Sequence, residues 1–228
     1  MEFIKSPRHL LKPIFVGDEY VGKTSLICKY TNNKYENKTT IDLFSKEIQI
    51  NNQDIRLLIW DIKGYGSFEK IVYNYIKDSN AYIILFDLTN LRSFYNINNW
   101  LHKIKNNNEL FNDYYPILLL GCKKDLTENR KVTFEEAKKF AIFNKLLYAE
   151  VSIDEDINRI NSLFNMYFNK ILNLYIPNDD FKYTNVYQIT DNKKNIIVNE
   201  EIEFLDDSKY KSKCCYNCKK HLETCNIQ

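Results

Sequence analysis

Near the start of the chain, two glycines frame a short loop that ends in a lysine and two hydroxyl side chains. The run reads Gly17-Asp18-Glu19-Tyr20-Val21-Gly22-Lys23-Thr24-Ser25. Glycine tolerates positive φ and lets a backbone approach a ligand closely, and Gly-x4-Gly-Lys-Thr is typical of a phosphate-binding loop. The loop amides and the start of a following helix would point at a phosphate, Lys23 would contact its oxygens, and the Thr24 hydroxyl would ligate Mg²⁺. We therefore expect a nucleotide phosphate site at residues 17–25.

The segments on either side of this loop support that interpretation. Residues 13–16 are apolar and predict a strand that stops at Gly17, and helical spacing over residues 22–32 predicts a helix directly after the loop. The alternative is an ordinary glycine-containing turn before a helix, with Lys23 on the surface. The order strand, loop, helix favours the phosphate site.

A second predicted strand ends in residues suited to the same site. Residues 57–60 are apolar and lead into Asp61-Ile62-Lys63-Gly64. Ligands of open α/β sheets bind beyond the carboxyl ends of the strands, so Asp61 would hold Mg²⁺ through water and the Gly64 amide could contact a γ-phosphate. Asp-x-x-Gly alone is more often a simple turn, and its spacing from the phosphate loop favours the metal role.

A third strand leads into a segment that could select a base. Residues 117–120 are apolar and are followed by Gly121-Cys122-Lys123-Lys124-Asp125. A carboxylate can accept both the N1 and the 2-amino protons of guanine, a donor pair that adenine lacks, so Asp125 would select guanine. Lys123 could lay its stem over the base.

Apolar strands and helical segments alternate along the first three quarters of the chain, which indicates an α/β fold with a largely parallel sheet. Strands are predicted at 13–16, 44–50, 55–60, 82–88, 117–120 and 146–151, and helices at 22–32, 67–77, 92–106, 133–143 and 156–174. Residues 51–54 form a turn, so the second and third strands should form a hairpin. We expect six strands, one of them an antiparallel edge strand, with helices on both faces.

Composition limits the remaining possibilities. The chain has 228 residues and a net charge of +2, which gives no reason to expect nucleic acid as a partner. No apolar run approaches the ~20 residues that a membrane-spanning helix needs, and residues 1–13 lack the apolar centre of a signal peptide, so we expect a cytosolic protein. Residues 1–177 form one predicted domain. Residues 178–228 are polar, then acidic, then basic, and we expect a flexible tail; the alternative is that 186–189 or 195–204 adds a strand.

Taken together, these motifs resemble a small GTPase of the Ras superfamily, and within it a Rab. Beyond the phosphate loop, the resemblance rests on Leu58-Ile59-Trp60-Asp61, Tyr82-Ile83-Ile84-Leu85-Phe86-Asp87-Leu88-Thr89-Asn90, Ser93-Phe94, Trp100-Leu101 and Lys124-Asp125-Leu126. It covers about residues 8–175. It implies the small-GTPase version of the P-loop NTPase fold, binding of GTP or GDP with Mg²⁺, and backbone amides at Ser152 that contact the guanine oxygen.

The chain departs from the Rab pattern around the γ-phosphate. The resemblance implies a threonine that ligates Mg²⁺ in the first switch; the segment here is short, and we choose Thr40, then Thr39, with the alternative that neither reaches the metal. Glu19 and Tyr20 replace small residues and would crowd the γ-phosphate, unless Glu19 turns outward to solvent. Tyr65 stands where the family has the glutamine that orients the attacking water, so hydrolysis should be slow.

A further departure concerns the base. Cys122 replaces an asparagine that, in the family, ties the base to the phosphate loop, and a thiol makes only weak hydrogen bonds. Losing one or two such bonds would cost about 1 to 3 kcal/mol, or roughly 5- to 150-fold in affinity.

The end of the chain resembles a lipid anchor. The last four residues, Cys225-Asn226-Ile227-Gln228, fit a prenylation box. Nearby lysines and palmitoylation of Cys214, Cys215 or Cys218 could supply the second signal that stable anchoring requires. The alternative is a zinc site made by Cys215, Cys218, His221 and Cys225.

The sequence thus predicts a monomeric, Rab-like guanine-nucleotide switch in vesicle trafficking, on the cytosolic face of an intracellular membrane. Its switch segments, about 33–45 and 62–76, would recruit effector and regulator proteins. GTP hydrolysis is expected from the family but uncertain because of Tyr65. The alternative is a pseudo-GTPase scaffold that holds nucleotide statically or not at all.

Overall fold

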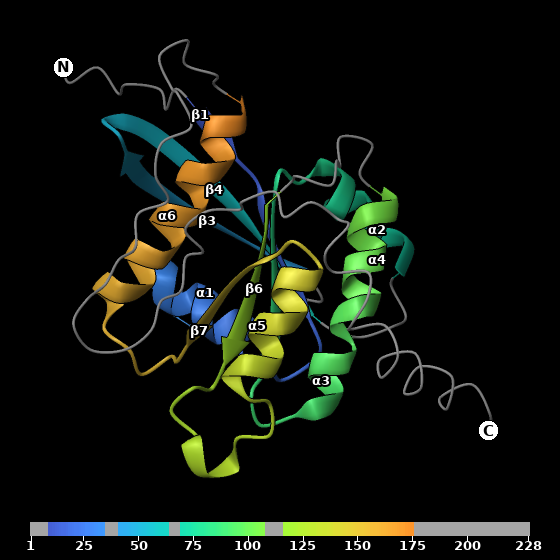
Figure 1. The fold of residues 1–228 in the computed structure, drawn as a ribbon. Coiled ribbons are helices and arrows are strands. Elements are labelled where there is room, and N and C mark those ends of the chain that lie inside the picture. Colours follow the sequence, from blue (N-terminus) through green and yellow to red (C-terminus); the bar gives the residue numbers. More distant parts are fainter. Residues whose placement is uncertain (1–8, 35–40, 64–68, 108–115, 176–228) are drawn as a thin grey trace, which may run out of the picture.

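The computed structural model describes residues 9–34, 41–63, 69–107 and 116–175 (Figure 1). One twisted sheet runs through the domain, and its strands follow the order β1-β4-β2-β5-β6-β7, with β3 on the other edge of β4. All pairings are parallel except β3 with β4, so the predicted antiparallel edge strand is confirmed. The strands are β1 His9–Leu11, β2 Pro13–Gly17, β3 Ile41–Ile50, β4 Gln53–Ile62, β5 Ala81–Asp87, β6 Ile117–Cys122 and β7 Leu147–Val151.

The sheet has seven strands where the sequence predicted six. The extra strand is β1, which the sequence did not predict; Lys12 separates it from β2, and there the ladder on β4 is interrupted. The backbone N–H of Lys12 donates to Asn80 Oδ1 at 2.7 Å, and its carbonyl accepts from the Asn80 N–H at 3.2 Å. Lys12 therefore pairs with Asn80, the residue before β5, and not with β4.

Helices cover both faces of the sheet (Figure 1). α1 and α6 contact each other on one face, and α2 and α3 contact α4 on the other. The helices are α1 Lys23–Thr31, α2 Glu69–Asp78, α3 Leu91–Tyr95, α4 Ile97–Asn107, α5 Phe134–Phe143 and α6 Ile157–Tyr175. Among the described residues, no helix is both long enough and apolar enough to cross a membrane.

Two local predictions can be checked closely. The β3–β4 hairpin turns at Asn51 and Asn52, whose φ values of 51° and 59° are those of the two-residue turn that suits a hairpin, as expected. The helix predicted over 92–106 is instead two helices that meet at Asn96. At Asn96 the helical turn is tighter, because the Asn99 N–H donates to the Asn96 carbonyl, three residues earlier, at 3.0 Å. The Asn96 side chain bonds a residue outside the helix.

The core lies on both faces of the sheet, and α6 supplies a large part of it on one face. Three aromatic residues of α6, Phe164, Tyr167 and Phe168, are each 0% exposed. The Tyr167 hydroxyl accepts from the backbone N–H of Tyr82 at 2.7 Å and donates to the carbonyl of Tyr82 at 2.8 Å. This contact fixes α6 against β5, and so holds the sheet whose carboxyl ends carry the candidate site.

Candidate functional site

The phosphate loop connects β2 to α1, as predicted. Gly17 has φ 143°, and a Cβ there would lie 2.2 Å from the carbonyl oxygen of Leu85. Gly22 caps α1 with φ 102°, in the left-handed region. Both positions therefore require glycine, the first because β5 is too close and the second because of its backbone conformation.

Lys23 is the charged centre of this loop. It is only 5% exposed, and its Nζ donates to the carbonyls of Gly17 at 2.9 Å and Asp18 at 2.6 Å. Burial lowers the pKa of Lys23 from 10.5 to about 8, against the opposing effect of the nearby Asp61 and Asp18 carboxylates. An ammonium carries three protons, so one remains for a further acceptor. A bound anion would restore the stability of this buried charge.

The two bulky residues of the loop lie at its surface. Glu19 is exposed, and Tyr20 is 88% exposed with φ 62°. A positive φ is strained for an aromatic residue, so Tyr20 occupies a position where glycine would be more comfortable. Val21 is buried and Ser25 is half-buried. The outward turn of the Glu19 side chain, one of the two possibilities that the sequence left open, stays a prediction.

The predicted metal ligands Thr24 and Asp61 lie side by side. Thr24 Oγ1 donates to Asp61 Oδ2 at 2.5 Å. Asp61 is 0% exposed, and its Oδ1 has no partner within the described residues. Burial raises the pKa of Asp61, while the Thr24 hydrogen bond and the charge of Lys23 lower it. A buried carboxylate oxygen without a partner, beside a hydroxyl, is a donor set that fits Mg²⁺.

Several predicted residues lie outside the described residues. These are Gly64, Tyr65, Thr39 and Thr40 in the switch segments, and the tail with Cys214, Cys215, Cys218, His221 and Cys225. Their roles stay predictions.

The base segments come together at the ends of β6 and β7. Asp125 Oδ1 accepts from Ser152 Oγ at 2.5 Å, and Ser152 Oγ accepts from the Asp154 N–H at 3.0 Å. Ser152 is buried and Asp125 is exposed. One oxygen of Asp125 is thus held by the neighbouring loop, which leaves the other to face a ligand.

Lys123 and Cys122 are held by contacts that the sequence did not reveal. Lys123 has φ 63°, and its Nζ lies 2.7 Å from Asp87 Oδ2 at the end of β5. Asp87 is buried, and its position at a strand end was the only signal that could have identified it. Burial, with the nearby Asp87 carboxylate, raises the pKa of Cys122 to about 12, so the thiol stays protonated. Its Sγ contacts the Leu120 carbonyl at 4.0 Å, a weak bond.

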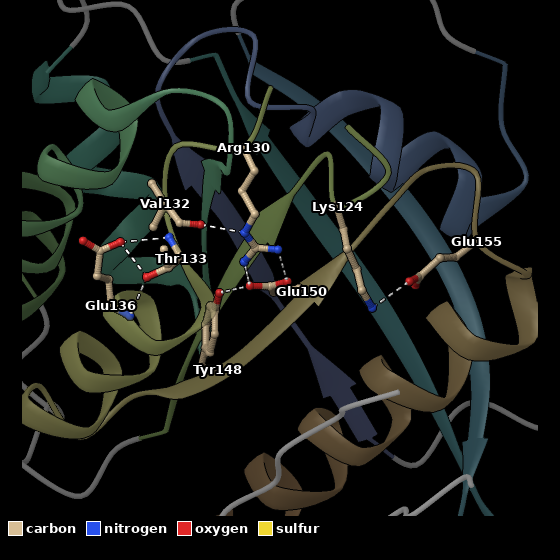
Figure 2. A network of polar contacts seen from close by, with 8 residues as sticks. All are labelled: Lys124, Arg130, Val132, Thr133, Glu136, Tyr148, Glu150 and Glu155. Atoms are coloured by element: carbon tan, nitrogen blue, oxygen red, sulfur yellow. Dashed lines mark hydrogen bonds and ion pairs between the residues drawn. The ribbon is translucent and has the colours of Figure 1, made fainter. Parts of the chain in front are cut away.

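A polar network joins the loop after β6 to β7 (Figure 2). Arg130 forms a bidentate ion pair with Glu150, in which Nη1 lies 3.0 Å from Oε2 and Nη2 contacts Oε1 more closely. The Arg130 Nε also donates to the Val132 carbonyl at 2.8 Å. The Tyr148 hydroxyl donates to Glu150 at 2.6 Å. The network fixes the segment that carries Asp125 against the strand that leads to Ser152.

The phosphate loop has a comparable attachment to α4. Asp18 Oδ2 accepts from Asn96 Nδ2 at 2.6 Å, and Oδ1 accepts from Trp100 Nε1 at 3.2 Å. No sequence pattern pointed to this contact. It connects the start of the phosphate loop to the helix layer that contains α2.

Comparison with known proteins agrees with this geometry. The Ras family model matches residues 12–173. "Ras-related protein Rab-4" of Dictyostelium discoideum is 36% identical over 150 residues, which cover 64% of this chain and 72% of the relative. "Ras-related protein Rab-11C" of the same organism is 29% identical over 201 residues, which cover 86% of this chain and 81% of the relative. The chain therefore belongs to the Ras family and is a Rab-like small GTPase.

Proposed function

We propose that the protein is a guanine-nucleotide switch with slow intrinsic GTP hydrolysis. The observation that carries the proposal is that a buried lysine, a hydroxyl–carboxylate pair and an anchored aspartate lie at one edge of the sheet. Lys23, Asp61 and Asp125 follow or end strands β2, β4 and β6, which all run in the same direction. This is the edge where α/β sheets bind their ligands.

Each residue has a separate part in binding. Lys23 would use its remaining proton on a phosphate oxygen, and the amides at the start of α1 would donate to the same group. Thr24 and Asp61 would hold Mg²⁺, which supplies positive charge to the phosphates when bound. Asp125 would accept from N1 and the 2-amino group of guanine, while Ser152 holds its other oxygen in place.

A binding experiment tests the proposal directly. Nucleotide released by heat from the purified protein should be GDP or GTP, and calorimetry should show binding of GDP that is lost in Lys23→Met. Asp125→Asn is the matched variant for base choice, because an amide can donate where the carboxylate accepts. It should weaken GDP and strengthen xanthosine diphosphate, which carries an oxygen in place of the 2-amino group. An empty site, with no heat for either guanosine form, would support the scaffold alternative and refute the switch.

Slow hydrolysis follows from Tyr65, because a phenol has a single oxygen for both donating and accepting, whereas an amide presents a separate NH2 donor and carbonyl acceptor to the attacking water. Single-turnover cleavage should therefore be faster in Tyr65→Gln than in the wild type, and Tyr65→Phe should match the wild type. A wild-type rate equal to that of Tyr65→Gln contradicts this part of the proposal.

An exposed apolar surface beside the switch segments supports binding of effector proteins. Leu43 on β3 is 53% exposed and pairs with Trp60 on β4. The rings of Trp60 and Tyr75 lie 4.5 Å apart, so α2 contributes to the same surface. Because β3 and α2 each adjoin a switch segment, a change of nucleotide there would alter this surface.

The role in vesicle trafficking and the membrane anchor rest on sequence alone. The Rab names of the relatives support the former, and the final Cys225-Asn226-Ile227-Gln228 supports the latter. Protein made in a eukaryotic cell should carry a prenyl group detectable by mass spectrometry and should bind anionic vesicles. Cys225→Ser should lose both properties. Vesicle binding that persists without the lipid would refute the anchor.

A further inference from the structure

The last turn of α1 reaches across to the loop that follows β7. Lys29 lies in this turn, and its Nζ donates to the backbone carbonyls of Ile153 and, at 2.6 Å, Glu155. A lysine near a helix C-terminus ordinarily bonds the last carbonyls of its own helix. Here the acceptors lie more than a hundred residues away in the chain, so the contact joins two separate parts of the site.

The loop that Lys29 holds also contacts the guanine-selecting segment. The Glu155 side chain forms an ion pair with Lys124 at 3.3 Å (Figure 2), and Ser152 donates to Asp125. A continuous path of contacts therefore runs from α1 through residues 152–155 to Lys124 and Asp125. α1 itself begins at Lys23, so the same helix joins the phosphate loop to both base segments.

This path matters because the loop has little structure of its own. Residues 152–156 lie in a turn and a bend between β7 and α6. The Glu155 N–H donates to the Ser152 carbonyl at 3.2 Å, and side chains bond the backbone at Ile153, Asp154 and Glu155. Cys122, which ends β6 nearby, contributes only a weak contact to Leu120 within its own strand. The cationic Lys29 is a much stronger donor to a carbonyl than a thiol is.

We infer that Lys29 is a positioning residue for guanine recognition: it fixes residues 152–155 relative to the phosphate loop, and through them it orients Asp125. The inference rests on the proposed guanine-nucleotide binding and adds to it. Lys29 does not contact the ligand itself. It acts by holding the base loops at the correct distance from the phosphate loop.

Three variants of the full-length chain test this role. Lys29→Met removes the donor and keeps the length of the side chain, and Lys29→Arg keeps the charge and the donors. Lys131→Met is the matched control, because Lys131 is an exposed lysine in the loop after β6 and its side chain has no hydrogen bond or ion pair within the described residues. Each is compared with the wild type by dissociation of a fluorescent GDP, by its preference for GDP over inosine diphosphate, and by hydrogen exchange.

Lys29→Met should release GDP about tenfold faster, which corresponds to about 1.4 kcal/mol. Its preference for GDP over inosine diphosphate should fall about threefold, because inosine lacks the 2-amino group that a well-placed Asp125 accepts from. Lys29→Arg should stay within about threefold of the wild type and Lys131→Met within about twofold. A merely structural loss would weaken both nucleotides equally, and that result overturns the inference.

Hydrogen exchange of the nucleotide-free protein separates this inference from the proposed function. Backbone amides of residues 152–156 should exchange faster in Lys29→Met than in Lys131→Met, whether or not nucleotide binds. Unchanged exchange there shows that Lys29 does not hold the loop and overturns the inference. A wild-type protein that binds no guanine nucleotide instead refutes the proposed function, and with it the guanine-recognition role of Lys29.

Discussion

Replacing Arg130 with methionine should destabilise the protein by about 2 to 3 kcal/mol. Breaking a buried ion pair by removing one partner typically costs about 3–5 kcal/mol, because it leaves a buried charge without compensation. The side chain of Glu150 is only 5% exposed, whereas that of Arg130 is 25% exposed, so water already solvates part of the pair. The Tyr148 hydroxyl also continues to donate to Glu150 after the change. These two effects place the expected loss below the full value for a buried pair.

Urea unfolding followed by circular dichroism measures this loss. The double variant Arg130→Met with Glu150→Met should recover at least about 1 kcal/mol relative to Arg130→Met alone, since it leaves no buried charge. Arg92→Met is the control, because Arg92 is exposed at the start of α3 and should stay within about 0.5 kcal/mol of the wild type. If Arg130→Met costs no more than the control, or if the double variant is no better than the single one, the pair behaves as a surface pair and the reasoning is wrong.

Three further predictions concern one buried charge and two hydrogen bonds. The pKa of Lys23 is about 8 in the folded protein and 10.5 ordinarily. Between pH 8 and 10.5 the folded, nucleotide-free protein therefore binds fewer protons than the unfolded chain. Its free energy of unfolding should rise by up to about 3 kcal/mol over this range. Urea unfolding across this range should show the rise in the wild type but not in Lys23→Met, and equal slopes refute it. Tyr167→Phe leaves the Tyr82 N–H without its acceptor and should cost about 1–3 kcal/mol by the same measurement; a neutral result means that another acceptor replaces the hydroxyl. Asn96→Ala removes the 2.6 Å hydrogen bond to Asp18. It should speed GDP release about 3- to 10-fold and lower the free energy of unfolding by less than about 1 kcal/mol. An unchanged release rate shows that this contact does not position the phosphate loop.

The sequence was sufficient to predict where a residue lies when its position depends on residues close by in the chain. The phosphate loop needs glycines at fixed offsets from Lys23, and the strand ends at Asp61 and Asp125 follow apolar runs that only a buried strand explains. Contacts between distant parts of the chain carried no such signal. Asp18 looks like any loop aspartate until the fold brings Asn96 beside it.

The two differences in secondary structure have the same cause. The sequence predicted the strand at 13–16 and missed β1, whose three residues are separated from β2 by the pairing of Lys12 with Asn80 in another segment. Likewise, the helical pattern over 92–106 continues through Asn96, whose side chain leaves the helix to bond Asp18. Tertiary partners decided both boundaries.

Because α1 carries both Lys23 and Lys29, its length sets the distance between the phosphate loop and the loop that follows β7. Lys23 and Lys29 are six residues apart on one helix, so they are separated by about 9 Å along its axis. Inserting a single alanine between them would rotate the later lysine by about 100° and carry it out of reach of residues 153 and 155. Lengthening α1 by one residue should therefore impair guanine discrimination while the phosphate loop itself stays intact.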